Sequence, residues 1–310
     1  MNPELNLTNN NNKNNQENHS KERIPRGKIL IFEHQPHENV YNPSRPFIIN
    51  GEKYILARVE DTRTNSSKVY PFVFKNGIWQ RKDWHLSQFE FEDPQITTIN
   101  NNLLLVVVRV LDKTDPDNWI IRSEFYFGPN LDNLKKITEG PIGMKDIRLI
   151  EFEGKIGVFL RPKVGRDKRG RISYLEINNL DELQVINQNT GRMIQLPISD
   201  NEWVGTNDVY YLGNGILGVL AHKGDQDQEG NLHYCAIAFK FNPQDFSIYD
   251  YQIIAQSNDF PLSVSKSPRY EDVIFPGGFE RFHRDNKELE LYTGLRDAEV
   301  GCILIKNPYL

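Results

Sequence analysis

The sequence has little of what marks disulfide-bonded or metal-binding proteins. It contains two cysteines among 310 residues, Cys235 and Cys302, and both fall within apolar segments typical of strands. A thiol in such a segment is usually buried and reduced. No cluster of cysteine and histidine has the spacing of metal ligands, and neither a P-loop nor a Gly-Xaa-Ser-Xaa-Gly motif occurs. We therefore expect no metal and no cofactor.

Long apolar runs and basic runs of the nucleic-acid-binding kind are also lacking. No apolar run approaches 18 residues, and no secretory signal segment is present. The net charge is -5, and the basic residues are dispersed along the chain. We therefore expect a cytoplasmic protein that binds neither a membrane nor nucleic acid.

Residues 1–25 differ in composition from the rest of the chain. They include four consecutive asparagines and lack apolar periodicity, which predicts a disordered tail. With 38% hydrophobic and 11% aromatic residues overall, the remainder has ample material for a core. We expect residues 26–310 to form one domain, because they repeat a single plan.

The segment from Asp93 to Arg109 shows this plan most clearly. It begins with an acid, runs through a short strand, turns over three asparagines and returns through an apolar strand to a base. The strands of a hairpin are antiparallel, so its first and last residues lie at the same end. We call these two positions the opening and the closing residue, and we expect Asp93 and Arg109 to be neighbours.

Four other segments repeat the plan. Their opening and closing residues are Asn42 and Arg58, Asp146 and Arg161, Asp208 and His222, and Asp272 and Arg296. Each hairpin is followed by further strand-like sequence, at residues 69–74, 119–127, 171–177, 233–241 and 300–305. Units of four strands cannot bury both faces alone and pack around an axis. The sequence therefore predicts an all-β fold, a five-bladed β-propeller with a central funnel.

Residues 28–33 form an additional predicted strand before the first hairpin. Propellers commonly close when one terminus completes the blade supplied by the other, so we expect this strand to pair with the last blade. The opening and closing residues would then ring one mouth of the funnel, with Asp297 directly after the last closing residue.

Residues 161–171 contain six cations. Such a run is often a solvated face, and its alternative function is an anion site, because Arg and Lys side chains suit phosphate oxygens. Carboxylates in the same funnel can bind sugar hydroxyls and protonate a glycosidic oxygen. The two kinds of group together indicate sugar transfer to or from a phosphorylated species.

The chain also resembles known families. Similarity to the inverting mannoside phosphorylases lies in Asn42-Pro43, Glu92-Asp93-Pro94, Arg161-Pro162, His222 near Gly224, Asp272-Val273-Ile274-Phe275-Pro276 with Gly278, and Tyr292 and Gly294 with Asp297. A closer resemblance, to a family long catalogued as a domain of unknown function, lies in Tyr41-Asn42, Arg58-Val59-Glu60, residues 144–149, Glu202-Trp203 and Asp272-Val273. Its trypanosomatid members are associated with β-1,2-mannan as mannosyltransferases and phosphorylases.

These resemblances imply a five-bladed propeller that inverts the anomeric carbon, with Asp93 as general acid. The expected reactants are a mannooligosaccharide with phosphate, mannose 1-phosphate or GDP-mannose. The residues that we expect to bind the sugar substrate are Asn42, Arg58, Asp146, Asp208, Asp272 and Asp297. Those that we expect to bind phosphate are Arg109, Arg161, Lys163 and His222. The chain departs from the phosphorylases at Gln95, where they have Arg, and from the closer family at Asp208, where Glu is more frequent.

Two other functions compete with this hypothesis. A propeller can bind carbohydrate or protein without turnover, because fold does not fix function. An inverting glycoside hydrolase would need a second carboxylate about 6.5 to 9.5 Å from the acid, with room for water between them.

Overall fold

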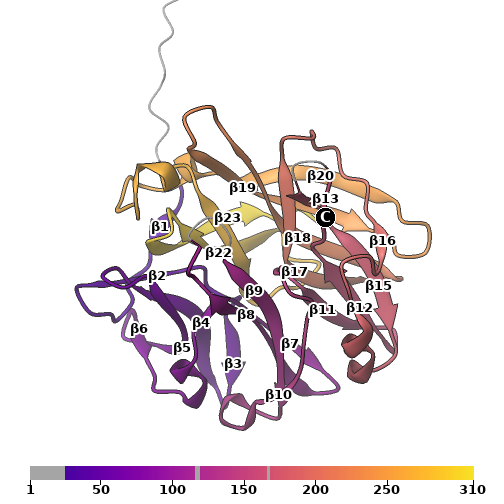
Figure 1. Cartoon of the computed structure of the whole chain (residues 1–310), viewed down its shortest axis with the longest axis horizontal. Coiled ribbons are helices and arrows are strands. Elements are labelled where there is room, and N and C mark those ends of the chain that lie inside the picture. The colour runs from indigo at the N-terminus through magenta and orange to yellow at the C-terminus, as the bar shows by residue number, and fades with distance from the viewer. Residues whose placement is uncertain (1–24, 116–118, 166–167) are drawn as a thin grey trace, which may run out of the picture.

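The computed structural model describes residues 25–115, 119–165 and 168–310. The tail predicted for residues 1–25 lies outside the described residues, except for Pro25. Strands are the main secondary structure of the described residues, and they form five small sheets around a common centre (Figure 1). The predicted five-bladed β-propeller is confirmed.

The first two blades contain nine strands. The first blade consists of β2 (Glu38–Tyr41), β3 (Phe47–Ile49), β4 (Glu52–Asp61), β5 (Ser66–Lys75) and β6 (Ile78–Arg81). The second consists of β7 (Phe91–Ile99), β8 (Asn102–Asp112), β9 (Ile120–Gly128) and β10 (Lys135–Glu139). In the first blade β2 and β3 both pair with β4, so they share the innermost position and leave a break between them.

The third blade carries an additional hairpin. Its sheet consists of β11 (Arg148–Phe152), β12 (Lys155–Leu160), β15 (Ser173–Ile177) and β16 (Arg192–Met193). Between β12 and β15 the chain forms the small hairpin of β13 (Lys163–Val164) and β14 (Arg169–Gly170). This hairpin includes part of the cationic segment 161–171, of which residues 166–167 lie outside the described part.

The last two blades complete the ring. The fourth consists of β17 (Trp203–Gly213), β18 (Ile216–Gln226), β19 (Leu232–Phe241) and β20 (Ile248–Ala255). The fifth consists of β21 (Ile274–Phe279), β22 (Glu288–Leu295), β23 (Glu299–Lys306) and β1 (Lys28–Ile29). The 3-10 helices η1 (His85–Gln88), η2 (Leu131–Asn133), η3 (Leu180–Val185), η4 (Ser257–Asp259) and η5 (Pro268–Tyr270) lie in the connections.

The predicted closure of the ring is confirmed. β1 pairs antiparallel with β23, with Lys28 opposite Cys302, so the start of the domain supplies the outermost strand of the last blade. Phe32 then pairs with Trp79 at the edge of the first blade, and their rings stack with centroids 5.7 Å apart. The N-terminal segment therefore joins the last blade to the first.

The hydrophobic core lies between the blades. In β8, Leu105 and Val107 pack against the first blade, whereas Leu104 and Val106 pack against the third. Side chains alternate between the two faces of a strand, and a blade is covered on both faces by its neighbours. This explains why the strands are apolar at consecutive positions, and it leaves polar side chains to the central axis.

No described helix is long and apolar enough to cross a membrane.

Candidate active site

The innermost strands are interrupted near the same end of the propeller, and polar residues occupy the interruptions. Asn42, Asp93 and Asp146 all have positive φ angles, of 45°, 48° and 58°. In the fourth blade the register shifts between Thr206 and Asp208, which makes Asn207 the bulged residue. A positive φ angle places a residue in the left-handed region of backbone conformation. Residues other than glycine adopt this region at an energetic cost, and Asn and Asp tolerate it best. Such strain is concentrated at functional sites.

These interruptions bring the opening residues together. Asn42 Nδ2 donates a hydrogen bond of 2.8 Å to Asp93 Oδ1, across the boundary between the first two blades. The other carboxylate oxygen of Asp93 lies 3.6 Å from Lys145 Nζ, which comes from the start of the third blade. Arg58 Nη1 lies 3.8 Å from Asp93 Oδ1. Asp93 is only 3% exposed, so it is a nearly buried acid at the junction of three blades.

One half of the site is rich in carboxylates. Arg58 Nη2 contacts Glu92 Oε1 at 2.8 Å and Glu60 Oε2 at 3.0 Å. Lys266 Nζ reaches the same Glu60 at 2.6 Å. Burial raises the pKa of Glu92 above its usual value, although Arg58 opposes this shift. We call this group of Arg58, Glu60, Glu92, Asp93 and Asp297 the acidic half.

Asp297 stands out within the acidic half. It follows the closing residue Arg296, and both have positive φ angles, of 51° and 55°. Its carboxylate has no hydrogen-bond or ion-pair partner among the described residues. Burial raises the pKa of Asp297 to about 6, against the opposing effect of Arg58 and Lys266. Asp297 is therefore an unengaged carboxyl group close to Asp93.

The other half of the site is rich in cations. Arg161 donates from Nη1 to Asp146 Oδ2 at 2.9 Å and from Nε to the carbonyl oxygen of Val204 at 3.0 Å. Lys145 lies nearby, a third of its side chain is exposed, and its charge acts on both Asp93 and Asp146. Lys163 lies two residues after Arg161 with much of its side chain in solvent, and partial burial of its ammonium group together with the charges of Arg161 and Lys145 lowers the pKa of Lys163. We call Lys145, Arg161, Lys163 and His222 the cationic half.

His222 is the one aromatic base of this half, and it is 1% exposed. Its Nδ1 lies 2.8 Å from Asn207 Oδ1, which can only accept, so Nδ1 carries the proton. Burial and the charges of Arg161 and Lys145 lower the pKa of His222 well below its usual value. The ring is therefore neutral at pH 7, and its Nε2 presents a lone pair 4.0 Å from Asp146 Oδ2.

Arg148 is buried and connects the backbone segments that carry the two halves. Its guanidinium donates to the backbone carbonyls of Asn207 at 3.0 Å, Ile147 at 3.1 Å and Asp93 at 3.5 Å. These carbonyls belong to three neighbouring blades, and each lies at or next to an interruption. One buried side chain thus holds the backbone on which Asp93 and the partner of His222 are placed.

Three residues expected in the site have their side chains elsewhere. Arg109 packs over the rings of Phe89 and Phe91, at 5.1 and 5.5 Å from their centroids. Asp208 accepts from Tyr210 Oη at 2.7 Å and pairs with Arg45. Tyr210 and Arg45 both line a cavity of about 330 Å³ at the opposite end of the axis.

Asp272 is half exposed and binds His233 on the outer side of the fourth blade. The structure therefore brings Asn42, Arg58, Asp93, Asp146, Asp297, Arg161, Lys163 and His222 to one mouth, and places Arg109, Asp208 and Asp272 outside it.

Sequence reasoning did not select several residues of the site. They are Glu60, Glu92, Lys145, Arg148, Asn207 and Lys266. Glu92 and Lys145 directly precede the opening residues Asp93 and Asp146, so adjacency to an opening residue was an available signal. For Lys266 no such signal exists, because its contact with Glu60 spans 206 positions of the chain.

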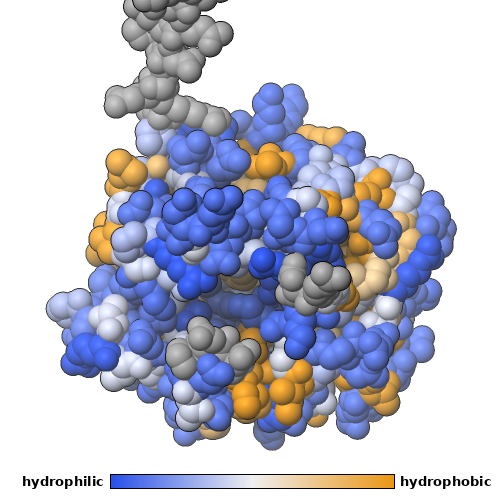
Figure 2. Space-filling view, turned by 45° about the horizontal axis from the view of Figure 1, so that its top comes forward, coloured by the Kyte–Doolittle hydropathy of each residue, from blue (hydrophilic) through white to orange (hydrophobic). Residues whose placement is uncertain are grey.

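The surface at the centre of the ring agrees with this description. Figure 2 shows a hollow near the middle of one face, lined by hydrophilic residues. Among the described residues, no group of three or more His, Cys, Asp and Glu side chains could hold a metal ion. What the arrangement can do chemically is to donate or accept a proton at Asp93, to bind hydroxyl groups and to bind an anion.

Solved structures of similar proteins provide an independent comparison. A mannose phosphorylase from Leishmania mexicana, in complex with phosphate ion, is 30% identical and aligns over 93% of this chain and 90% of that chain, with a TM-score of 0.82. A GDP-Man-dependent mannosyltransferase from the same organism is also 30% identical, over 91% of this chain and 89% of that chain, with a TM-score of 0.78.

A third structure is more distant. The β-1,2-mannobiose phosphorylase of Listeria innocua is 14% identical over 88% of this chain and 92% of that chain, with a TM-score of 0.61, which shows a shared fold. A search of curated proteins finds no match. Residues 16–310 match the family described as a protein of unknown function, DUF1861. Since this match covers nearly the whole chain, the protein belongs to the DUF1861 family, and its similar structures indicate a carbohydrate-active enzyme.

Proposed function

We propose that this protein is an inverting mannosyl-transferring enzyme that acts on β-1,2-linked mannooligosaccharides. In one direction it uses phosphate and releases mannose 1-phosphate, and in the other it uses mannose 1-phosphate or GDP-mannose as donor. The observation that carries the proposal is the division of the site into an acidic and a cationic half around Asp93. The names of the two relatives at 30% identity, a mannose phosphorylase and a GDP-Man-dependent mannosyltransferase, support the choice of sugar.

The acidic half suits the sugar. Carboxylates bind the hydroxyl groups of a sugar ring, and Asp297 has no partner among the described residues that would compete. Asn42 Oδ1, next to Asp93, is buried and accepts no hydrogen bond from any described residue. A buried acceptor left unpaired costs about 1 to 3 kcal/mol, so a sugar hydroxyl at this place would remove a cost that the free protein carries.

The cationic half suits the anion. Burial lowers the pKa values of His222 and Lys163, and the neighbouring positive charges of Arg161 and Lys145 lower them further. Arg161 and Lys145 donate hydrogen bonds that are strengthened by charge, and phosphate oxygens accept such bonds well. The neutral His222 can accept the remaining proton of a monohydrogen phosphate through Nε2. A hydrolase would instead need a carboxylate free to activate water, whereas Asp146, the carboxylate beside this half, is paired with Arg161.

This arrangement supports a reaction in a single displacement. Asp93 gives its proton to the glycosidic oxygen while a phosphate oxygen attacks the anomeric carbon from the opposite face. The bond between that carbon and the glycosidic oxygen breaks, and a bond to phosphate forms, which inverts the β-linkage to α-mannose 1-phosphate. The shortened oligosaccharide leaves with the proton of Asp93. In the synthetic direction the same carboxylate accepts the proton of the attacking hydroxyl.

The decisive experiment incubates the purified protein with β-1,2-mannobiose or mannotriose and inorganic phosphate. We expect α-mannose 1-phosphate, measured by phosphorus NMR or a coupled assay, and no product without phosphate. Release of free mannose in the absence of phosphate would establish the hydrolase instead. Binding of mannobiose without turnover, in this assay and with GDP-mannose as donor, would establish a non-catalytic propeller.

A further inference from the structure

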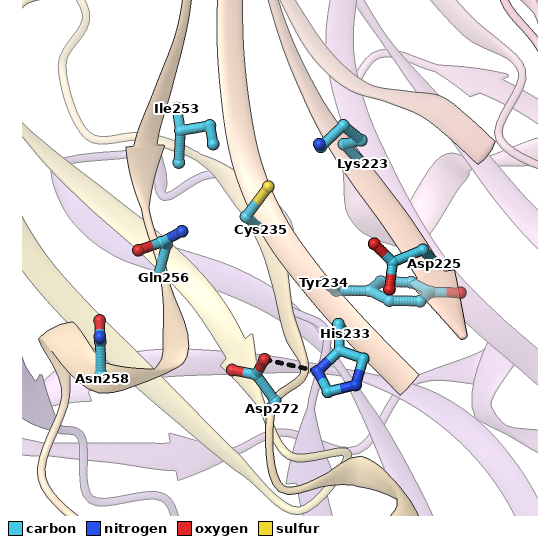
Figure 3. Close-up of a pocket in the computed structure, with 9 residues that line it drawn as sticks. All are labelled: Lys223, Asp225, His233, Tyr234, Cys235, Ile253, Gln256, Asn258 and Asp272. Carbon is cyan, nitrogen blue, oxygen red and sulfur yellow. Dashed lines mark hydrogen bonds and ion pairs between the residues drawn. The ribbon is translucent and has the colours of Figure 1, made fainter. Parts of the chain in front are cut away.

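His233 joins the fourth blade to the fifth on the outer side of the site. Its Nδ1 lies 2.8 Å from Asp272 Oδ2, and its Nε2 lies 3.3 Å from Asp227 Oδ2. Asp227 belongs to the turn between β18 and β19, whereas Asp272 belongs to the segment that leads into β21. Figure 3 shows His233 and Asp272 pointing toward one another at the edge of a cavity of about 290 Å³.

The backbone reinforces this junction. The amide of Tyr234 donates to the carbonyl oxygen of Asp272 at 2.9 Å, and His233 and Asp272 form an isolated parallel bridge. The hydroxyl of Ser257 also donates to Asp272 Oδ1. Asp272 thus ties the beginning of β19 to two segments that lie outside the fourth blade. We call the pair His233 and Asp272 the latch.

The latch lies directly beside a wall of the cationic half. Tyr234, the residue after His233, stacks parallel to His222 with ring centroids 5.6 Å apart and an interplanar angle of 2°. Its hydroxyl accepts a hydrogen bond of 2.9 Å from Trp203 Nε1. Gly224 makes room for this arrangement, because a Cβ atom there would lie 2.6 Å from the ring of Tyr234. The ring of Tyr234 is therefore held by His222, Trp203 and Gly224, and the latch fixes the backbone that carries this ring.

We propose that His233 and Asp272 are positioning residues that hold Tyr234 against His222 and thereby set the affinity of the cationic half for its anion. This rests on the proposed function in one respect, since it takes the anion to be phosphate. Both latch residues lie outside the mouth, so we expect them to act through the wall that Tyr234 forms.

The charges around the latch make its strength dependent on pH. His233 faces Asp272 from the lead-in to β21, Asp227 from the turn and Asp225 from β18. Hydrogen bonding to Asp272 raises the pKa of His233, with Asp227 and Asp225 acting in the same direction. Below this raised pKa the imidazolium donates to both carboxylates, and above it the neutral ring can donate to only one. The latch therefore weakens as the pH rises through the pKa of His233.

The test compares Asp272→Ala and His233→Gln with the wild-type protein in the phosphorolysis assay, at pH 6 and pH 8. We expect Asp272→Ala to raise the KM for phosphate about tenfold at pH 6 while kcat stays within about twofold, because one charge-assisted hydrogen bond is lost outside the reacting groups. His233→Gln keeps one neutral donor at every pH. The phosphate KM of His233→Gln, divided by that of the wild type, should therefore be larger at pH 6 than at pH 8. Because phosphate titrates equally in both assays, its own ionisation cancels in this ratio.

Two controls separate the latch from general effects. Ser257→Ala removes the other side-chain bond of Asp272 without touching His233. Asp285→Ala removes the partner of His283, a similar exposed pair 3.7 Å apart in the connection between β21 and β22. Neither control should change the phosphate KM by more than about twofold.

The outcomes distinguish the latch from the proposed function. An unchanged phosphate KM in both latch variants, with normal wild-type turnover, would overturn the latch alone. If the wild type shows no turnover, calorimetric titration with inorganic phosphate replaces the assay. Weaker phosphate binding by folded latch variants would then support the latch without the proposed reaction. Unchanged phosphate binding by these variants, or no phosphate binding by the wild type, would overturn the latch. If Asp272→Ala fails to fold, His233→Gln decides the question.

Discussion

Asn42 binds Asp93 through a hydrogen bond of 2.8 Å, although the two residues are 51 positions apart in the chain. They occupy the same position in adjacent blades, and both adopt a left-handed backbone conformation there. The hydrogen bond fixes Oδ1 of Asp93, whereas Oδ2 faces Lys145 of the next blade. The repeat therefore explains both where the acid lies and why one of its oxygens remains available for proton transfer.

The first prediction concerns this acid. Asp93→Asn keeps an acceptor for Asn42 but removes the transferable proton, so turnover should fall by a factor of about a hundred to ten thousand. The melting temperature should change little, because the shape and the hydrogen bond are retained. Steady-state phosphorolysis and thermal denaturation measure the two effects. Asp285→Asn, on an exposed connection, is the matched control, and activity of the Asp93 variant within a few-fold of that control would contradict the assignment.

The second prediction concerns the anion. Millimolar inorganic phosphate or mannose 1-phosphate should raise the melting temperature of the wild type, because a ligand that binds only the folded state stabilises it. Arg161→Ala should remove most of this shift. The free variant should itself be less stable by about 1 to 3 kcal/mol, because Asp146 is fully buried and loses its 2.9 Å partner.

Lys240→Ala is the control for the second prediction. Lys240 pairs with Asp250 on the outer part of the fourth blade, so its removal changes net charge by the same amount. The phosphate shift should persist in this variant. A shift of equal size in Arg161→Ala would exclude Arg161 from the anion site.

The pattern of opening and closing residues was sufficient to predict the fold and several of the residues that the structure brings to one mouth. Apolar runs separated by turns rich in Asn, Gly and Asp define the hairpins, and the number of hairpins defines the number of blades. Asn42 follows β2, Asp93 lies within β7 and Asp146 lies two residues before β11, and each is the polar residue that opens its repeat. The signal is local, and the symmetry of the propeller then brings distant copies together.

The fourth blade shows where such reasoning fails. Asp208 fits the pattern of opening residues, yet the bulged residue is Asn207, and it is Asn207 that contacts His222. Successive side chains of a strand point to opposite faces of the sheet, so an error of one position selects a side chain with entirely different neighbours. A bulge is set by contacts with neighbouring blades, such as the bond from Arg148 to the Asn207 carbonyl, and the local sequence does not specify them.

The third prediction concerns the closure of the ring. Phe32 is 7% exposed and packs on Trp79 and on Phe72, whose ring centroid is 4.9 Å away. Phe32→Ala should lower the free energy of unfolding by about 3 kcal/mol, through lost burial and the cavity left behind. Urea denaturation measures this loss. Ile31→Ala, at a neighbouring residue that is 63% exposed, should change it by less than about 0.5 kcal/mol. Equal effects of the two substitutions would show that the N-terminal segment does not fasten the first blade.

The last prediction separates stability from function at Asp297. Its pKa is raised to about 6 in the folded protein, so the folded state holds this proton more strongly than the unfolded chain does. Stability should therefore be highest below the ordinary pKa of an aspartate, fall as the pH rises toward about 6, and stay reduced above it.

Asp297→Asn removes the ionisable group, and with it the loss of stability that ionisation of the buried carboxyl group causes. The variant should be more stable than the wild type at pH 8 by about 1 to 2 kcal/mol, a range that allows for solvent screening of a partly exposed group, and should show no gain at pH 4. Its turnover should fall, because a neutral amide replaces the carboxylate that faces the sugar. Urea denaturation at the two pH values, with the phosphorolysis assay at pH 7, measures both effects. A variant that is less stable than the wild type at pH 8 would mean that Asp297 is a structural partner of Arg58 and Lys266, and a variant with full activity would remove it from the sugar-binding half.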